Sequence, residues 1–410
     1  MTGWQRMGRQ LDLRTGRPVW SAYRAPRVPT AALTRDVRTD VLVVGMGISG
    51  AMIADALTEA GHAVMAIDRR GPMLGSTAAT TALVQFELDT PLVKLAAMIG
   101  KDAAERAWRR SRLAVANLMA RIEVVGIDCR LAPRRSLYLA GDVLDADGLA
   151  EEGAARRAAG LSARLLDGSD LRETYGLRRD AALESAGNLS LDPRKLTAGL
   201  LLAARARGAR LYAPVKATDF SHSADGVEVV TAGGPVIRAA HVVLATGYEL
   251  TDPVPAKRHR IISTWAIATR PQPRAIWPHA AFMWEASDPY LYLRATHDGR
   301  VICGGEDEEF TDEDARDALI PEKTARVAAK LAKLLPGIDA TPEFAWAGAF
   351  GSTTTGMPII RRLPRKPRMH AVMGYGGNGI TFSRLAAEIV ETDLAGGTDR
   401  DARLFADATN

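Results

Sequence analysis

Three glycines spaced as G-x-G-x-x-G carry the clearest chemical signal in the sequence. Gly45, Gly47 and Gly50 follow the apolar run Val41–Val44. An unbroken apolar run predicts a strand buried on both faces, and residues 51–60 then predict a helix. Gly45 would permit a tight turn, Gly47 the close approach of a pyrophosphate, and Gly50 close packing of helix on strand. The free N–H groups at the start of the helix would face the phosphates.

A second predicted strand completes this pattern. Residues 63–67 are mostly apolar, and Asp68 follows them eighteen positions after Gly50 (68 − 50). A carboxylate at such a distance accepts hydrogen bonds from a ribose diol. A dinucleotide site is predicted by this order of features: strand, glycine turn, helix, strand and acid. The alternative is a glycine-rich turn that binds no ligand.

Two other segments have compositions that suit a large ligand. The run Gly75–Ala82 holds only small and hydroxyl side chains, which favours a segment threading beside a flat molecule. Near the other end of the chain, Gly374–Thr381 is a second glycine-rich start of a helix, which is predicted to continue to about Leu394. Its N–H groups would face another edge of the same ligand.

Composition and charge restrict the class of protein. With 410 residues, 47% hydrophobic and 25% charged, the chain is expected to form two intertwined lobes of an ordinary soluble protein. The net charge is only +5, and the densest basic run, Arg361–Arg368, is short, so nucleic acid is not predicted.

No apolar stretch approaches the roughly 18–20 residues of a membrane helix. Without a secretory signal either, the expected location is cytoplasmic. Cys129, Cys303 and seven scattered histidines show no ligand spacing, so no metal is predicted.

The rest of the chain alternates helical and extended patterns. Residues 1–37 are predicted to form an extended arm over the core, with a floppy tail as the alternative for the first ten. Helices are expected at 90–127, broken at Gly100 with an N-cap at Asp102, at 145–159, at 193–207 with an N-cap at Asp192, and at 311–335, the last interrupted at Pro321. Strands are expected at 136–139, 210–212, 215–220, 227–231, 241–245, 261–269, 281–285, 290–294, 300–304, 344–350 and 369–373. The region 260–305 is rich in aromatic residues, which either face a cavity or pack in the core.

Three segments together resemble the D-amino-acid oxidase superfamily of FAD-dependent oxidoreductases, which includes glycine, sarcosine and γ-glutamylputrescine oxidases. They are Gly45–Asp68, the strand end Val243–Gly247, and the C-terminal motif Gly374–Ser383. The resemblance covers the chain from Asp40 to about Val390. Similarity to the γ-glutamylputrescine oxidase-like branch is greatest at residues 284–285, 289–294, 304–307 and 346–348.

This resemblance implies a mixed α/β (α+β) fold, with a Rossmann-like FAD-binding domain and an antiparallel-sheet substrate domain over the flavin ring. We expect the FAD-binding domain at 38–88, 187–259 and 345–410, and the substrate domain at 89–186 and 260–344. FAD is expected to bind non-covalently, because no His or Cys lies in residues 75–85. The residues expected to contact FAD are Gly45, Met46, Gly47, Ile48, Ser49, Gly50, Asp68, Arg69, Ser76, Thr77, Thr81, Val215, Ala245, Thr246, Gly247, Gly376, Gly377, Asn378, Gly379, Ile380 and Thr381.

The expected substrate pocket departs from the family pattern. Many members hold the substrate carboxylate with an Arg at the position where this chain has Phe350, and Phe cannot form that clamp. The substrate then either lacks a carboxylate at its reacting end, or the carboxylate is held by Arg260 or Arg294. Tyr292 matches a pocket tyrosine of glycine-oxidase-like relatives and is the first expected substrate contact; a core tyrosine is the alternative.

The sequence therefore predicts an enzyme that oxidises the C–N bond of a small amine or amino acid to an imine with FAD and, in the simplest case, oxygen. No catalytic side chain is assigned, because the cofactor supplies the difficult chemistry. Two alternatives stay open. The flavin is reoxidised by a quinone or a protein, or the chain is an FAD-binding subunit without turnover. The second is kept open by Phe350, Thr355 and Arg361, where the family usually has Arg, Asp and Gly.

Overall fold

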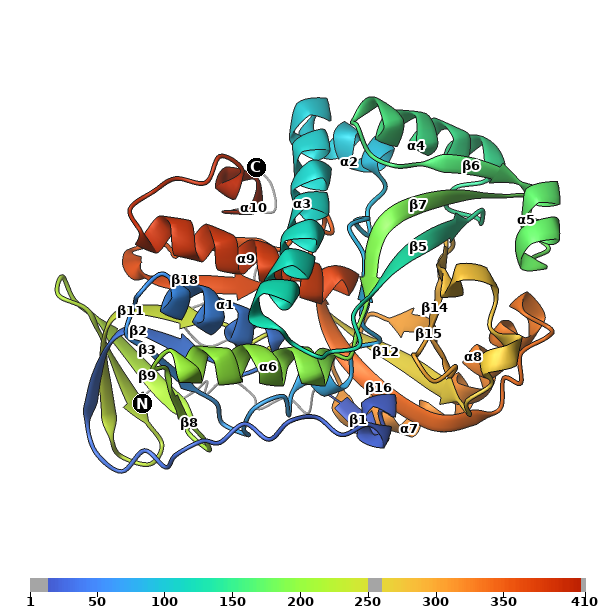
Figure 1. Cartoon of the computed structure of the whole chain (residues 1–410). Coiled ribbons are helices and arrows are strands. Elements are labelled where there is room, and N and C mark those ends of the chain that lie inside the picture. Colours follow the sequence, from blue (N-terminus) through green and yellow to red (C-terminus); the bar gives the residue numbers. More distant parts are fainter. Residues whose placement is uncertain (1–13, 250–259, 407–410) are drawn as a thin grey trace, which may run out of the picture.

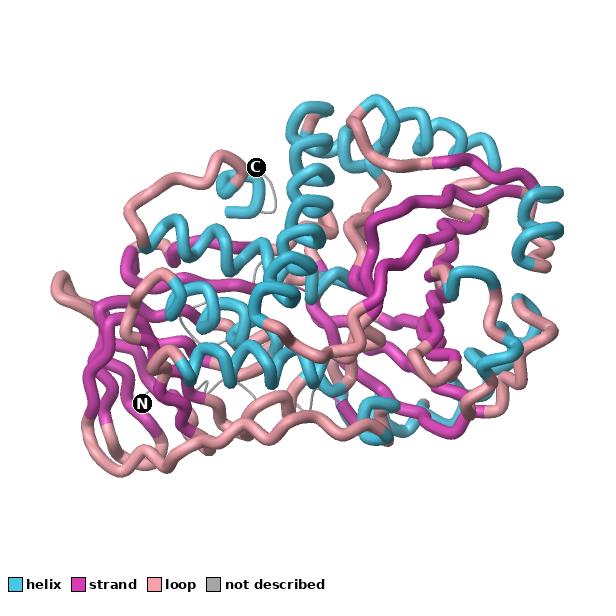
Figure 2. Tube along the Cα trace, in the orientation of Figure 1, coloured by secondary structure: helices cyan, strands magenta, loops and turns pink. Residues whose placement is uncertain are grey.

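Two sheets organise the chain in the computed structural model, which describes residues 14–249 and 260–406 (Figures 1 and 2). The eight-stranded sheet has a parallel centre. Its strands in order are β17 (Ile359–Leu363), β18 (Lys366–Met373), β11 (Val236–Leu244), β2 (Val37–Val44), β3 (Val64–Ile67) and β8 (Arg210–Tyr212), with β10 (Val227–Thr231) beside β11 and β9 (Ala217–His222) beside β10.

The second sheet is mainly antiparallel and has ten strands. Only β13 pairs with β5 in the parallel sense. The strands in order are β1 (Arg14–Gly16), β16 (Pro342–Ser352), β12 (Arg260–Thr269), β15 (Val301–Glu308), β14 (Leu291–Ala295), β13 (Phe282–Glu285), β5 (Ala132–Leu139), β7 (Ala181–Ser190) and β4 (Leu83–Val84), with β6 (Arg164–Asp167) beside β7. The predicted mixed α/β fold with an antiparallel sheet is confirmed.

The two faces of β2 pack against different layers. Val41 and Val43 share a core with α1 (Ile48–Glu59), α6 (Pro193–Ala206) and α9 (Gly379–Leu394), the three helices that lie over this sheet in Figure 1. Leu42 and Val44 pack with apolar residues of β9 and β10 on the other face. Because successive side chains of a strand point to opposite faces, a strand covered on both sides must be apolar throughout. This explains the unbroken run before Gly45.

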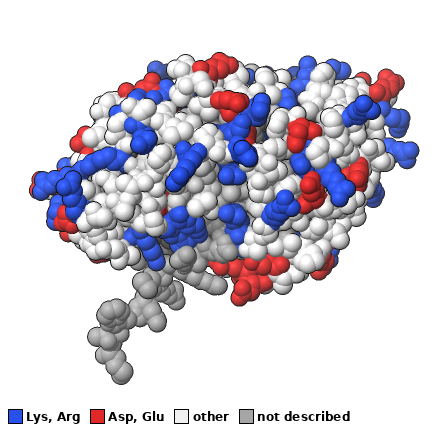
Figure 3. All heavy atoms as spheres, turned by 60° about the horizontal axis from the view of Figure 1, so that its bottom comes forward, with Lys and Arg blue, Asp and Glu red and all other residues white. Residues whose placement is uncertain are grey.

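Seven further helices complete the described part of the chain: α2 (Leu92–Ile99), α3 (Lys101–Val125), α4 (Ala146–Ala158), α5 (Gly168–Tyr175), α7 (Glu313–Ala318), α8 (Ile320–Leu334) and α10 (Ala402–Ala406). None of the helices in residues 14–249 and 260–406 is both long and apolar enough to cross a membrane. On the face drawn in Figure 3, basic and acidic side chains are interspersed.

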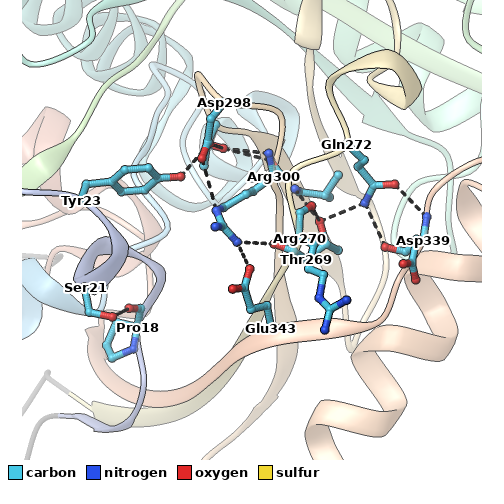
Figure 4. Close-up of polar contacts among 12 residues, drawn as sticks. Pro18, Ser21, Tyr23, Thr269, Arg270, Gln272, Asp298, Arg300, Asp339 and Glu343 are labelled. Atoms are coloured by element: carbon cyan, nitrogen blue, oxygen red, sulfur yellow. Dashed lines mark hydrogen bonds and ion pairs between the residues drawn. The ribbon is translucent and has the colours of Figure 1, made fainter.

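The N-terminal arm lies over the core from residue 14 onward, as predicted. Its strand β1 pairs with β16. Trp20 Nε1 donates to the carbonyl of Thr80 (2.6 Å), and Tyr23 Oη donates to Asp298 Oδ1 (2.7 Å), the contact drawn in Figure 4. These bonds tie the arm to both the small-residue run and the ten-stranded sheet. The floppy-tail alternative for the first ten residues lies outside the described residues.

Local signals placed most helix ends correctly. Asp192 caps α6 by accepting from the N–H groups of Arg194 (2.9 Å) and Lys195 (3.1 Å). The predicted N-cap at Asp102 is wrong. Gly100, at φ +88°, ends α2 and caps α3 directly, so Asp102 lies inside the first turn. A left-handed glycine reverses the chain in one residue and leaves no room for a separate cap.

Other boundaries shift or were missed. Pro321 lies at the start of α8 rather than interrupting a helix, as the fixed φ of proline permits. The strand expected at 215–220 begins two residues later, as β9. The long strand β7 was not predicted, because its buried residues include the polar Glu184, Ser185, Asn188 and Ser190, so the sequence shows neither an apolar run nor alternation.

Candidate functional site

One cavity of about 510 Å³ is lined by residues of both sheets. The eight-stranded side contributes the turn after β2, the loop after β3 and the first residues of β9. The ten-stranded side contributes β12, β14 and β16 with several aromatic rings. The small-residue run and the C-terminal glycine motif also reach the cavity. Segments far apart in the sequence therefore share one site.

The turn between β2 and α1 requires its glycines. Gly45 has φ +116°, and a Cβ atom added there would lie 2.3 Å from the carbonyl oxygen of Ala245. A Cβ atom on Gly50 would lie 1.8 Å from the carbonyl oxygen of Gly45, so α1 packs directly on the turn. At Gly47 a Cβ atom would project to within 3.2 Å of Thr77 Oγ1. At Gly45 and Gly50 neighbouring backbone atoms leave no room for a side chain. At Gly47 the nearest atom is a side-chain hydroxyl, so a ligand can approach the backbone there.

Asp68 organises the same turn. Its Oδ2 accepts from the N–H of Met46 (2.8 Å), and its Oδ1 accepts from the N–H groups of Arg70 (2.8 Å) and Gly71 (2.9 Å). The carboxylate also lines the cavity. It therefore couples the glycine turn to the end of β3, in addition to any contact with a ligand. The N–H of Val215 donates to the main-chain oxygen of Asp68 (2.8 Å), which brings Val215 to the same end.

The small-residue run is held by side chains from three directions. Its segment Ser76–Ala78 is a short 3-10 helix. Three side-chain donors hold the carbonyl groups that follow: Trp346 Nε1 to Ala79 (2.8 Å), Trp20 Nε1 to Thr80 (2.6 Å) and Arg294 Nη1 to Ala82 (2.6 Å). These large side chains fix the main chain of the run, and the side chains that the run itself presents to the cavity are all small.

The C-terminal motif is fixed against the strand region that follows this run. Asn378 Nδ2 donates to the carbonyl of Glu87 (2.8 Å), and Thr381 Oγ1 donates to the carbonyl of Gln85 (2.6 Å). The hydroxyls of Ser49 and Ser383 are 2.7 Å apart, which joins α1 to α9. The starts of two helices therefore converge on one cavity, and each presents N–H groups that favour an anionic or electron-rich ligand edge.

The structure brings together nearly all the residues expected to contact FAD. All of them line the cavity except Met46, Gly50 and Thr381, which lie behind the lining. Among the described lining residues there is neither His nor Cys, and the buried thiols of Cys129 and Cys303 lie elsewhere.

The substrate-contact candidates separate into two groups. Tyr292 and Phe350 line the cavity. The Arg260 side chain is 70% exposed and pairs with Glu309 (3.2 Å). Arg294 is buried, and besides Ala82 it donates to the carbonyl of Leu191 (3.2 Å). Neither arginine lines the cavity, so neither of these two candidates supplies a replacement carboxylate clamp there.

Several lining residues were not singled out from the sequence. Trp284 and Tyr290 belong to the aromatic-rich region, where alternation alone could not separate cavity from core. Gln85 and Asp89 gave no signal at all. Asp89 Oδ2 accepts from the N–H of Gly377 (2.8 Å). Although Asp89 is exposed to the cavity, the protein atoms packed around its carboxyl group desolvate it and raise its pKa to about 6, while the hydrogen bond from the Gly377 N–H lowers it.

The residues present fit a dinucleotide such as FAD. The cradle at Gly45–Gly50 suits a pyrophosphate, Asp68 a ribose, and the second helix start at Gly376–Ile380 the electron-rich edge of a flavin. Ser76 Oγ lines the cavity, is buried and has no hydrogen-bond partner among the described residues, so it is available to a ligand.

Comparisons with known proteins agree with this arrangement. The chain is 26% identical over 387 residues to the gamma-glutamylputrescine oxidoreductase of Escherichia coli (strain K12), covering 91% of this chain and 87% of that protein. It is 25% identical over 378 residues to the glycine oxidase of Geobacillus kaustophilus (strain HTA426), covering 86% and 92%. Among solved structures, the L-proline dehydrogenase from P. horikoshii has the same fold, with a TM-score of 0.77, 19% identity and coverage of 91% and 97%.

The family described as "DAO: FAD dependent oxidoreductase" matches residues 40–392, which is most of the chain. The match contains the glycine turn, Asp68 and the C-terminal motif that together line the cavity. This protein therefore belongs to the DAO family of FAD-dependent oxidoreductases.

Proposed function

We propose that this chain uses FAD to oxidise the C–N bond of an amine, with an amino acid as the less favoured substrate. The observation that carries the proposal is the single cavity, which joins the dinucleotide turn at Gly45–Gly50 to the aromatic residues of the ten-stranded sheet. When bound, FAD accepts a hydride equivalent from the carbon next to nitrogen. The substrate loses that hydride and one N–H proton, and water hydrolyses the resulting imine.

The chain's own residues bind, orient and exclude water. The turn after β2 and the start of α9 would hold the two ends of the cofactor, and Asp68 would hold its ribose. Trp284, Tyr290 and Tyr292 would form a wall against the reacting end of the substrate. An aromatic wall favours apolar and cationic groups over a carboxylate.

The preference for amines rests on the missing clamp. A carboxylate buried in a dry pocket needs a fixed cation. Phe350 lines the cavity where the family's arginine is expected, while Arg260 and Arg294 lie outside the lining. We therefore expect primary or secondary amines to react faster than glycine, sarcosine or D-alanine.

Several finer points belong to the same proposal. Non-covalent FAD is supported by the absence of His and Cys from the described lining residues. We propose that the two sheets form the cores of an FAD-binding domain and a substrate domain. Because β16 lies wholly in the ten-stranded sheet, the boundary between the substrate domain and the last segment of the FAD-binding domain fits better near residue 352 than at residue 345. A cytoplasmic location, a small-molecule substrate, and the absence of metal and nucleic acid stay predictions.

One anaerobic screen tests the proposal. Purified protein is mixed with a panel of amines and amino acids while the flavin absorbance is followed. Bleaching by amines supports the function, and failure of every compound to bleach the flavin would favour a silent FAD-binding subunit. Stopped-flow mixing of the reduced protein with air-saturated buffer then separates an oxidase from a dehydrogenase. The dehydrogenase alternative is included in the test because an L-proline dehydrogenase has the same fold.

Release of the cofactor is tested separately. Acid or heat precipitation should leave FAD in the supernatant. Yellow colour that stays with the precipitate would contradict non-covalent binding.

A further inference from the structure

Charge is distributed unevenly along the cavity. The eight-stranded side and its loops contribute every Lys and Arg that lines it within the described residues, namely Arg69, Arg70, Lys216 and Lys366. Arg69 and Arg70 both pair with Glu249. The described residues of the ten-stranded sheet contribute no charged side chain to the lining, only Leu83 and aromatic, small and hydroxyl residues. A substrate at the aromatic end therefore meets no protein cation from that sheet.

Asp89 brings a negative charge to this end. Besides accepting from Gly377, its carboxylate lies close against the glycine motif, because a Cβ atom on Gly376 would be 2.5 Å from Oδ2. Within residues 14–249 and 260–406 the structure shows no ion pair to it. Burial raises the pKa values of the Tyr248 and Tyr290 hydroxyls, and the charge of Asp89 adds to the effect. Asp89 and these two cavity rings are therefore electrostatic neighbours.

A second carboxylate, that of Asp307, lies near Tyr290. Burial raises the pKa of Asp307 to about 6, the nearby hydroxyls of Thr264 and Tyr290 lower it, and the charge of Asp89 raises it further. Because Thr264 and Tyr290 both line the cavity, Asp307 adds negative potential near the aromatic wall.

Two polar side chains of the lining also have unused donors. Gln85 Nε2 and Trp284 Nε1 are buried and have no hydrogen-bond partner among the described residues, and each side chain is only 9% exposed. Both residues line the cavity. Buried polar groups in proteins are normally hydrogen-bonded, so these two N–H donors indicate a ligand atom that accepts hydrogen bonds, such as a cofactor oxygen or the lone pair of a neutral amine, and they do not themselves bind an ammonium group.

The reaction limits which cation can pair with Asp89. A nitrogen whose neighbouring carbon loses a hydride must carry a lone pair, so the reacting amine has to be neutral at that moment. Asp89 is exposed to the cavity in the structure. Once ligands fill the cavity and exclude water, a neutral amine would leave the Asp89 carboxylate without a counter-charge, which is unfavourable. A substrate with a second nitrogen avoids this conflict, because one nitrogen stays protonated while the other reacts.

We propose that the substrate is a diamine or polyamine whose non-reacting ammonium group binds Asp89 beside the aromatic wall. This inference rests on the proposed amine oxidation and names the substrate class. The ammonium would donate a charge-assisted hydrogen bond to the Asp89 carboxylate and gain a cation–π contribution from the rings. An α-amino acid would bring its carboxylate toward Asp89 and be repelled.

The first experiment compares matched amines on the FAD-loaded protein. 1,4-Diaminobutane and 1-aminobutane differ by one terminal ammonium group. The half-saturating concentration for anaerobic flavin reduction is expected to be roughly 10- to 100-fold lower for the diamine, as one charge-assisted hydrogen bond implies. Asp89→Asn keeps an acceptor for Gly377 but removes the charge, and should abolish this preference. Asp225→Asn removes one charge from an exposed turn outside the lining and should preserve it.

A binding measurement separates this inference from the proposed function. Butane-1,4-bis(trimethylammonium) and butyltrimethylammonium have no nitrogen lone pair and cannot be oxidised at carbon. Because they have no N–H either, they test the charge and cation–π interactions with Asp89 and the rings rather than the hydrogen bond. Their dissociation constants follow from titration of the flavin absorbance. The dication should bind the unmodified protein more tightly, and Asp89→Asn should remove the difference.

Each outcome decides a different question. If no amine bleaches the flavin but the dication binds through Asp89, amine oxidation is wrong and the cation site stands. Equal affinities of the dication and the monocation for the unmodified protein would overturn the inference, even if Asp89→Asn lost its FAD. Equal losses for monoamine and diamine in Asp89→Asn would also overturn it, because Asp89 would then act only on the glycine motif.

Discussion

Replacing Gly50 with Ala tests whether the packing of α1 on the glycine turn creates the FAD site. The added Cβ atom would lie 1.8 Å from the carbonyl oxygen of Gly45 and 2.8 Å from its carbonyl carbon. An ordinary contact begins at 3.4 Å, so helix and turn must separate by up to 1.6 Å (3.4 − 1.8). Neither partner is a flexible side chain that can rotate away.

The surrounding structure resists that shift. Gly50 is buried, and α1 is covered by α6 and α9 and joined to α9 through Ser49 and Ser383. Overpacking of a core costs about 1–3 kcal/mol where side chains can adjust, so a backbone overlap should reach at least the upper end of that range. We expect a large loss of FAD occupancy and a clear fall in melting temperature.

The assay is the ratio of flavin to protein absorbance after purification, together with thermal unfolding. Gly337→Ala is the matched control, because a Cβ atom there meets nothing within 4 Å and the residue has no positive φ. The control should keep full occupancy. An occupancy and melting temperature like those of the unmodified protein in Gly50→Ala would refute the packing argument.

Three further perturbations follow from the site and its surroundings. Asp68→Ala removes an acceptor of three backbone N–H groups as well as the expected ribose contact. Charge-assisted hydrogen bonds contribute about 1.5–3 kcal/mol, so FAD affinity should fall roughly 10- to 100-fold in a fluorescence titration. An unchanged dissociation constant would contradict the assignment of Asp68. Phe350→Arg places a cation in the cavity, so amine reduction rates should fall and those of small amino acids should rise; amine rates that stay the same would show that Phe350 lies away from the substrate. Burial alone would raise the pKa of Asp393, but hydrogen bonds from His370 and Arg362 lower it from 3.8 to about 2. A depressed folded-state pKa stabilises the protein above the unfolded value, so the stability lost in Asp393→Asn should be constant above pH 4 and shrink between pH 4 and pH 2; a gap that persists at pH 2 would contradict this.

The sequence was sufficient wherever the signal is local. The glycine turn could be recognised because Gly45 must adopt a positive φ and Gly50 must touch backbone, and both requirements act within six residues. Two other features are local as well. The cap at Asp192 depends on hydrogen bonds within three residues, which require a side-chain acceptor, and the burial of β2 on both faces requires consecutive apolar residues.

Tertiary structure alone decided which charged residues reach the cavity. Arg294 was a candidate clamp because its strand lies in the aromatic region, but its guanidinium holds the carbonyls of Ala82 and Leu191 instead. Asp89 gave no sequence signal, because its position against Gly377 depends on a contact across 288 residues. Charges act through space, so their partners are set by how distant segments pack, and residue spacing along the chain carries no record of that packing.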